Sequence, residues 1–350
     1  MKKKILIIIL GLVLFIIGSY FYTNITYIKK PLRKMYSAGF TEKQIELKDG
    51  TVLNYGEGPN NGKTPLLLIH GQGMTWEDYA KVLPELSKHY HVYAIDCHGH
   101  GETDWNPEKY SAKEMAEDFI EFIDTVIGEK TVVSGHSSGG MIAAWIAAYS
   151  PNHILGTVIE DSPFFSTEAG RRENTYVWVY GFQLYEDFKN QKDEEDYFKY
   201  SLERSYWKNI FGEKLWNKIS KDAVAYHKKH PEEPVHLKYL PPQINRLFES
   251  VTYPYDQRFG ETFYDNSWFK DYDQEEVLSK IKSPTVFIKA NTTYDGDLLV
   301  AALSDEDADR VVGLLEKGKR IDVDSPGHDI HYDKPDEFIE IMVDFLNELE

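Results

Sequence analysis

The stretch that decides the fold is Thr131-Val-Val-Ser-Gly-His-Ser-Ser-Gly-Gly140. It begins as a β-branched run typical of a buried strand, and an apolar helical pattern follows at residues 141–149. Between them, Gly135-His136-Ser137-Ser138-Gly139 has the form G-x-S-x-G, which in a strand–turn–helix context makes a very sharp turn. Side chains at the two outer glycines would collide with neighbouring backbone. The turn lifts the Ser137 hydroxyl above the sheet, so Ser137 is the predicted nucleophile.

An earlier apolar strand ends in a second glycine loop, His70-Gly71-Gln72-Gly73. A His-Gly pair at this place resembles the oxyanion-hole loop of the α/β-hydrolase family. In that family, one amide of the loop and the amide after the nucleophile bind the oxyanion, so the resemblance implies Gln72 and Ser138 for these roles. An ordinary glycine turn is the alternative interpretation of the loop.

The loop Asp96-Cys-His-Gly-His-Gly101 resembles the D-x-x-G-x-G loop that follows the next strand in the same family. The resemblance implies a mostly structural role for His98 and His100. A metal site that adds His89 and His91 is the alternative, but acidic partners at ligand spacing are missing. No cofactor or metal is expected.

A late loop, Gly327-His328-Asp329, follows the last predicted strand and precedes Pro335 and a closing amphipathic helix. The general base of an α/β-hydrolase lies at this place, which implies that His328 accepts the Ser137 proton while an acid orients its ring. His331 is the alternative base, and we expect it to face solvent or to pack on the start of the helix.

The acid that orients the histidine departs from the usual family pattern. The region after the seventh predicted strand reads Lys289-Ala-Asn-Thr-Thr-Tyr-Asp-Gly-Asp297, where Asp295 is a candidate and Asp297 a weaker one. A second family arrangement places the acid after the sixth strand, which here predicts Asp161. The structural alternatives are a strand-end cap for Asp161 and a plain Asp-Gly turn for Asp295. Asp161 is the preferred candidate.

Short apolar runs alternate with amphipathic helical stretches from about residue 43 onward. The predicted strands are 43–47, 51–55, 65–70, 91–96, 131–135, 156–160, 284–290 and 320–323. The predicted helices are 76–86, 112–127, 141–149, 305–315 and 335–349. This alternation favours an α/β class with a mostly parallel, doubly wound sheet, which fits the α/β-hydrolase resemblance.

A helical lid is predicted at residues 163–280, inserted after the sixth strand. This stretch has no convincing strand and holds 26 of the 49 aromatic residues. Most of these rings are expected to pack a lid core, and a few to line an acceptor pocket. The catalytic domain is then formed by residues 41–162 and 281–350, with residues 1–40 as an N-terminal segment.

The N-terminal segment predicts a membrane anchor. Three lysines precede an uncharged apolar run at residues 5–22, long enough to span about 27 Å as a helix. The run ends in Ser-Tyr-Phe-Tyr without a small-residue cleavage site, so an uncleaved anchor is preferred over a cleaved signal peptide. Basic residues flank both ends, but a short basic N-tail normally stays cytoplasmic, which predicts an extracytoplasmic catalytic domain.

The 350 residues carry a net charge of −18, although residues 1–40 hold six Lys, one Arg and no acid. This balance argues against a nucleic-acid-binding protein and predicts that the acidic body is repelled by anionic lipid. The single cysteine, Cys97, excludes intrachain disulfides and Cys-based zinc clusters.

The resemblance implies a serine hydrolase that cleaves a carboxylic ester of apolar or lipid-like character through an acyl-enzyme. A serine nucleophile disfavours the epoxide-hydrolase and dehalogenase branches. Acyl transfer, peptide cleavage and C–C bond hydrolysis on the same triad remain alternatives. So do a non-catalytic anchored binding protein and a metal-dependent hydrolase. The expected partners are a small-molecule ester and the membrane, and no nucleic acid.

Overall fold

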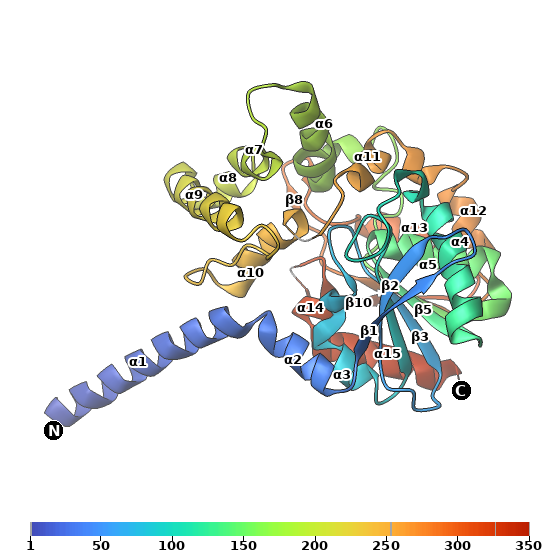
Figure 1. Ribbon diagram of the computed structural model, residues 1–350, viewed down its shortest axis with the longest axis horizontal. Helices are drawn as coiled ribbons and strands as arrows, with labels where there is room; N and C mark the ends of the chain where they lie inside the picture. The colour runs from blue at the N-terminus through green and yellow to red at the C-terminus, as the bar shows by residue number, and fades with distance from the viewer. Residues whose placement is uncertain (1, 253, 326, 350) are drawn as a thin grey trace.

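A central sheet of eight strands organises the chain in the computed structural model, which describes residues 2–252, 254–325 and 327–349 (Figure 1). The strand order is β1-β2-β4-β3-β5-β6-β7-β10. β1 and β2 pair antiparallel, as do β2 and β4, and the pairs from β4 to β10 are parallel. The strands are β1 (Thr41–Glu46), β2 (Val52–Glu57), β3 (Pro65–Ile69), β4 (His91–Ile95), β5 (Thr131–His136), β6 (Ile154–Glu160), β7 (Thr285–Lys289) and β10 (Gly318–Asp322).

Helices cover both faces of the sheet, because successive side chains of the buried strands point to opposite faces. Leu67 and Val133 pack with α4 (Ala112–Phe122), α5 (Ser138–Tyr149), α12 (Gln274–Lys280) and α13 (Asp305–Leu314). Leu66 and Val132 pack on the other face with η1 (Trp76–Lys81), α3 (Leu83–Leu86) and α15 (Pro335–Leu349). The predicted doubly wound α/β class is thus confirmed, and every predicted strand is present with ends shifted by one or two residues.

Two predicted helices differ from those observed. The helix expected at residues 76–86 is a 3-10 helix, Trp76–Lys81, followed by the short α3, because Pro84 cannot continue an α-helical hydrogen-bond ladder. The helix expected at residues 112–127 changes to a π-helix over Ile123–Ile127 and ends at Gly128, whose φ is 72°. A small hairpin, β8 (Tyr294–Asp295) with β9 (Leu298–Leu299), was not predicted.

The insertion between β6 and β7 is helical and packs in two units. Its first and last parts join the core of the sheet through side chains such as Phe182 and Phe259. Its middle part has a core of its own, built around Trp216 and Phe248. Its remaining helices are η5 (Arg172–Asn174), η6 (Trp178–Phe182), α6 (Gln183–Asn190), α7 (Tyr197–Glu203), α8 (Trp207–Phe211), α9 (Glu213–Lys229), α10 (Pro242–Asn245), η7 (Arg246–Val251), α11 (Arg258–Tyr264) and η8 (Ser267–Phe269).

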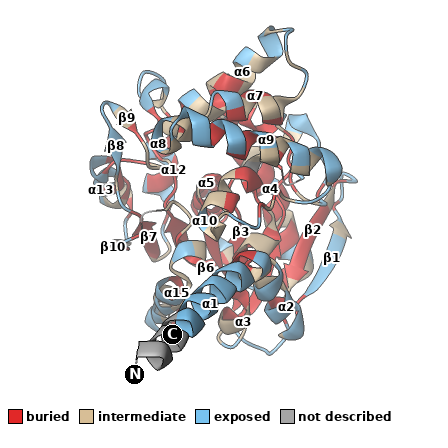
Figure 2. Cartoon of the chain, turned by 90° about the vertical axis from the view of Figure 1, so that its left-hand side faces the viewer, coloured by how far each residue is buried: buried red, intermediate tan, exposed pale blue. Residues whose placement is uncertain are grey.

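Two helices form the N-terminal segment and meet at a bend of 62°. α1 (Lys2–Thr26) projects away from the body, and α2 (Lys29–Ser37) packs beside η1 (Figure 1). The described part of α1 is exposed along almost its whole length (Figure 2). Within the described residues, no single helix has the length and hydropathy of a bilayer span, whereas residues 10–26 and 29–37 together reach them.

Candidate active site

Ser137 occupies the sharp turn between β5 and α5. Its backbone lies at φ 54° and ψ −123°, outside the regions that residues with side chains normally adopt. Such a conformation costs about 1–3 kcal/mol and persists only where surrounding contacts impose it. Here the Ser137 amide donates to the Glu160 carbonyl at 3.0 Å, and the Ser162 hydroxyl donates to the Ser137 carbonyl at 2.5 Å. The predicted turn is therefore present, with Ser137 at its apex.

The two outer glycines of this turn have no room for a side chain. A Cβ on Gly135 would lie 2.1 Å from the Gly139 carbonyl oxygen, and a Cβ on Gly139 would lie 2.4 Å from the Ile69 carbonyl oxygen. Because both obstacles are backbone atoms, they cannot move aside. This is the local reason why the turn needs the G-x-S-x-G pattern.

The structure brings His328 and Asp161 together although 167 residues separate them. His328 Nδ1 donates to Asp161 Oδ2 at 2.8 Å. Asp161 directly follows β6 and is 1% exposed, and its other oxygen accepts from the Ala290 amide at 3.1 Å. With Nδ1 engaged, Nε2 is the ring nitrogen of His328 that is left to exchange a proton with a substrate or nucleophile.

Opposite charges shift the pKa values of this pair in opposite directions. Burial raises the pKa of Asp161, but the hydrogen bond and charge of His328, the charge of Lys289 and the Ala290 amide together outweigh burial and lower that pKa below 3.8. Burial lowers the pKa of His328, but the Asp161 hydrogen bond and charge outweigh that and raise it above 6.5. Asp161 is thus ionised at neutral pH, and it favours the protonated form of His328 that a proton-transfer step would create.

His328 lies beside the Ser137 turn. The His136 ring nitrogen Nε2 donates to the His328 carbonyl at 3.2 Å, and the centroids of the two rings are 4.5 Å apart. Within the described residues, no hydrogen bond joins the Ser137 hydroxyl to His328. Catalytic hydrogen bonds are often long before substrate binds, so the arrangement remains compatible with proton transfer.

Asp295 and Asp297 lie away from His328. Asp295 is exposed on the β8–β9 hairpin, where it accepts a hydrogen bond from the Tyr206 hydroxyl at 3.1 Å. Gly296, at φ 59°, makes the tight turn of this hairpin. The Asp-Gly pair therefore forms the plain turn that the sequence offered as an alternative, and of the candidate acids the structure brings Asp161 to the histidine.

The glycine loop after β3 touches the Ser137 turn. A Cβ on Gly71 would lie 2.7 Å from His136 Nδ1 and 3.0 Å from Ser137 Cβ. The Gly73 amide donates a hydrogen bond to His100 Nε2 at 3.0 Å, so it is not available to bind an oxyanion. Ser138 is the first residue of α5, so its amide has no acceptor within the helix. The amides of Gln72 and Ser138, for which the described residues show no hydrogen-bond acceptor, fit the predicted oxyanion site.

The histidines after β4 have the structural role that the resemblance implies. His98 Nε2 pairs with Asp118 at 2.8 Å, and both His98 and His100 are fully buried. His100 accepts the Gly73 amide and packs on Tyr255 of the insertion, with ring centroids 4.8 Å apart. His100 thus helps to hold the loop that carries Gln72.

His331 is fully buried, so the expectation that it faces solvent is wrong, although it does lie in the short α14 (Ile330–Asp333) at the start of the closing helix. Its Nδ1 contacts Glu160 at 2.9 Å and its Nε2 contacts Asp78 at 3.0 Å. Burial lowers the pKa of His331, but the two carboxylates outweigh burial and raise it to about 10. His331 is therefore a cation at neutral pH and cannot act as a general base.

A partly buried arginine that no sequence motif indicated lies beside this group, with 11% of its side chain exposed. Arg246 of η7 donates to Asp78 at 2.7 Å and to Asp329 at 2.8 Å, and its guanidinium lies 3.7 Å from the centre of the Tyr332 ring. It also pairs with Glu249 at 3.1 Å. Because Asp329 directly follows His328, the Arg246–Asp329 ion pair connects the insertion with the loop that carries the candidate base.

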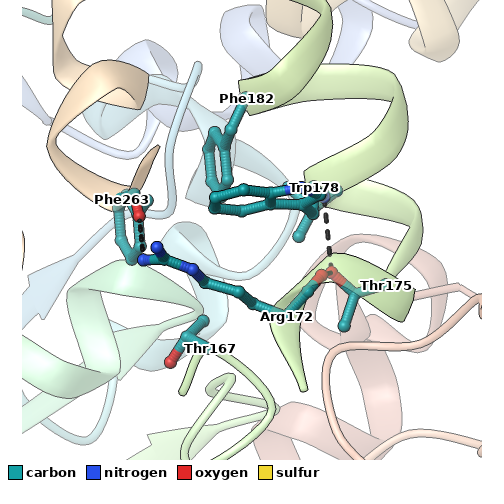
Figure 3. Close-up of a pocket in the computed structure, with 7 residues that line it drawn as sticks. Thr167, Arg172, Thr175, Trp178, Phe182 and Phe263 are labelled. Carbon is teal, nitrogen blue, oxygen red and sulfur yellow. Dashed lines mark hydrogen bonds between the residues drawn. The ribbon is translucent and has the colours of Figure 1, made fainter. Parts of the chain in front are cut away.

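Two hollows lie away from Ser137. One, with about 180 Å³ of empty space, is lined by Thr167, Arg172, Thr175, Val177, Trp178, Phe182 and Phe263. Arg172 crosses it beneath Trp178 and donates to the Phe263 carbonyl at 2.8 Å (Figure 3). The other, with about 1430 Å³ of empty space that includes open solvent, lies between the N-terminal segment, β1 and residues 232–234. The aromatic residues at the first hollow, Trp178, Phe182 and Phe263, therefore pack against one another and against Arg172. This is the core-packing role that was expected for most rings of the insertion.

Comparison with known proteins agrees with this geometry. Residues 64–335, well over half of the chain, match the family model of the alpha/beta hydrolase fold. The chain belongs to the α/β-hydrolase fold family. A Haemophilus influenzae protein that bears the name of an esterase/lipase is 24% identical over 316 residues, which cover 89% of this chain and 94% of that protein.

Two further comparisons extend the family relation. Mouse (Mus musculus) epoxide hydrolase 4 is 32% identical over 126 residues, which are 35% of this chain and 35% of that protein. The solved structure of a membrane phospholipase A shares the fold of this hydrolase at a TM-score of 0.60 and 20% identity, over 100% of this chain and 99% of that one.

The raised pKa of His328 predicts how the hydrolase responds to pH. Because a general base must be neutral, kcat/KM should fall about tenfold per pH unit below that pKa. Asp161→Asn removes the charge that raises it, so the inflection of the residual activity should move to lower pH. Rates on a short-chain ester between pH 4 and 9 would measure this. An inflection that moves to higher pH in the variant would contradict the assignment.

Proposed function

We propose that this α/β-hydrolase is a membrane-anchored serine hydrolase that cleaves carboxylic esters through Ser137, His328 and Asp161. The 2.8 Å contact between His328 and the buried Asp161, on the loop beside the strained Ser137 turn, carries the proposal. The esterase/lipase name of the relative that matches almost the whole chain supports an ester substrate.

The reaction has two steps. Ser137 Oγ attacks the ester carbonyl and its proton passes to His328 Nε2, while the amides of Gln72 and Ser138 hold the developing oxyanion. The C–O bond to the alcohol then breaks, and His328 returns the proton to the leaving alcohol. In the second step His328 takes a proton from water, which attacks the acyl-enzyme, and Ser137 regains its proton as the acid leaves.

The exposed apolar residues of α1 support an anchor and, with it, a lipid-like ester. They include Leu14, Phe15 and Ile16, each at least 60% exposed. A contiguous apolar helix surface of this kind is rare on a soluble monomer and fits a bilayer. The short basic N-tail favours a catalytic domain on the extracytoplasmic side.

Labelling with a fluorophosphonate probe tests the proposed nucleophile, because this reagent forms a covalent bond with an activated serine hydroxyl. The full chain should be labelled, Ser137→Ala should not be, and Ser138→Ala, which keeps the nucleophile and the backbone amide, should still be labelled. An unlabelled wild-type protein, or equal labelling of Ser137→Ala, would refute the proposal and favour a non-catalytic binding protein.

A further inference from the structure

The outer face of α9 and the adjoining loop form a basic surface on an acidic protein. Residues 207–240 hold seven Lys and four acids, whereas the whole chain has a net charge of −18. We call nine exposed basic and large apolar residues of this stretch the α9 face: Ile210, Lys214, Leu215, Lys218, Lys221, Lys228, Lys229, Lys238 and Tyr239. Three acids of the same stretch, Glu213, Glu232 and Glu233, are exposed too, so the basic residues outnumber the acidic ones without excluding them. The α9 face mixes basic and large apolar side chains, as on surfaces that lie against lipid headgroups.

The α9 face is in contact with α1. The Tyr20 hydroxyl of α1 donates to the Tyr239 carbonyl at 3.0 Å, and the Asn24 amide donates to the Lys238 carbonyl at 3.4 Å. Tyr239 in turn reaches α9, where its hydroxyl donates to Asp222 at 2.7 Å and the Lys218 ammonium lies 4.7 Å from its ring centre. A continuous set of contacts therefore fixes the α9 face relative to the end of α1.

Large apolar side chains are exposed both on α1 and on the α9 face. Phe15 of α1 is 74% exposed, and on the α9 face Ile210 is 56% and Leu215 is 50% exposed. α9 also lies on the side of the molecule from which α1 projects, as Figures 1 and 2 both show. The α9 face thus lies on the side of the molecule that carries α1.

Much of the positive charge here is unpaired. Among the described residues, no carboxylate lies within ion-pair distance of Lys214, Lys221, Lys229 or Lys238. The start of α2 adds four exposed basic residues: Lys29, Lys30, Arg33 and Lys34. The His236 ring of the loop donates to the Asn24 carbonyl of α1, so the loop that carries Lys238 lies against the N-terminal segment.

We propose that the α9 face lies on the surface of an anionic lipid bilayer that α1 enters. The proposal deepens the proposed function and rests on its membrane anchor. Charge complementarity decides the partner, because the free lysines match anionic headgroups while Leu215 and Ile210 reach toward the acyl boundary. The expectation that anionic lipid repels the body rests on its net charge, and this proposal assigns the opposite behaviour to the α9 face.

Selective labelling can test the proposal in the full chain. The one native cysteine, Cys97, is 1% exposed, so an introduced surface cysteine can be labelled alone. We would place a fluorophore at Leu215→Cys and, as control, at Lys317→Cys, an exposed position before β10. The chain is reconstituted in lipid nanodiscs with nitroxide-bearing lipids, with or without about 30 mol% phosphatidylglycerol.

In anionic discs, quenching at Leu215→Cys should exceed quenching at Lys317→Cys by about twofold or more. This excess should be smaller in neutral discs, and also at about 1 M salt, where charges are screened. The triple variant Lys214→Glu, Lys218→Glu, Lys221→Glu should lose this excess. The triple variant Lys282→Glu, Lys317→Glu, Lys319→Glu, which makes the same charge change elsewhere, should keep it when labelled at Leu215→Cys.

The possible failures are distinguishable. A chain that is not retained in discs would overturn the anchor and this proposal together. A retained chain without excess quenching at Leu215→Cys, or with quenching indifferent to anionic lipid, would overturn only this proposal. A dimeric mass in detergent together with a shielded Leu215→Cys label would show instead that a second copy covers the α9 face, and would also overturn it.

Discussion

Asp161→Asn should lower kcat for ester hydrolysis by about 10³–10⁴-fold. Asp161 holds His328 through a 2.8 Å hydrogen bond to Nδ1 and is the charge that raises the pKa of that ring. An Asn at this place can present its amide nitrogen to Nδ1 and so stabilise the wrong tautomer, in which Nε2 no longer accepts a proton. Steady-state rates on a short-chain ester would measure the loss.

Asp295→Asn is the matched control for this variant. Asp295 is exposed, and its side chain accepts a hydrogen bond from the Tyr206 hydroxyl on the surface, so its loss should leave kcat within about twofold of wild type. Urea unfolding of both variants would separate a catalytic effect from lost structure. A large fall in kcat with Asp295→Asn and a small one with Asp161→Asn would show that the acid has been assigned wrongly.

His331→Gln should lower the free energy of unfolding by about 3–5 kcal/mol. The fully buried His331 cation lies between Glu160 and Asp78, and its removal leaves these buried carboxylates with less compensation. The control is His153→Gln, which removes a largely exposed contact with Asp124 at 2.7 Å. Such a surface pair contributes about 0–1 kcal/mol, so urea titrations of the two variants should differ clearly.

The contacts of His331 with Glu160 and Asp78 also predict that the stability of the fold depends on pH. The pKa of His331 is about 10 in the folded chain and 6.5 in a model compound. Because folding raises this pKa, the stabilisation is complete below about pH 6.5 and is lost as the pH rises through about 10. The stability difference between wild type and His331→Gln should therefore shrink over that interval. A difference that grows with pH would show that His331 is not the buried cation.

How much of the site could be predicted depends on how far apart its residues stand in the sequence. Ser137, its glycines and the strand before it form one contiguous stretch, so a local pattern identified them. The choice between Asp161 and Asp295 remained open, because both follow a predicted strand and only the loop paths decide which one reaches His328. In the structure, the hairpin turn at Gly296 leaves Asp295 on the surface, and Asp161 is the acid that contacts His328.

The buried charge cluster could not be predicted at all. Arg246, Asp78 and Asp329 come from three distant parts of the chain, and each alone has the pattern of a solvated surface residue. His331 was expected to face solvent or to pack on the start of the closing helix; it packs there, with its ring 5.9 Å from that of Phe338, but its two carboxylate partners were not foreseen. A charge becomes buried only when its partners assemble around it, and that information is not present in any one segment.

Local information in the amino-acid sequence was sufficient for the α/β class, the strand positions and the Ser137 turn, because periodicity and backbone sterics act between near neighbours. Folding in three dimensions decided which acid meets His328, that His331 is a buried cation, and that the loop after α9 lies against α1. These depend on which loops and helices become neighbours, and that is set by packing of the whole chain.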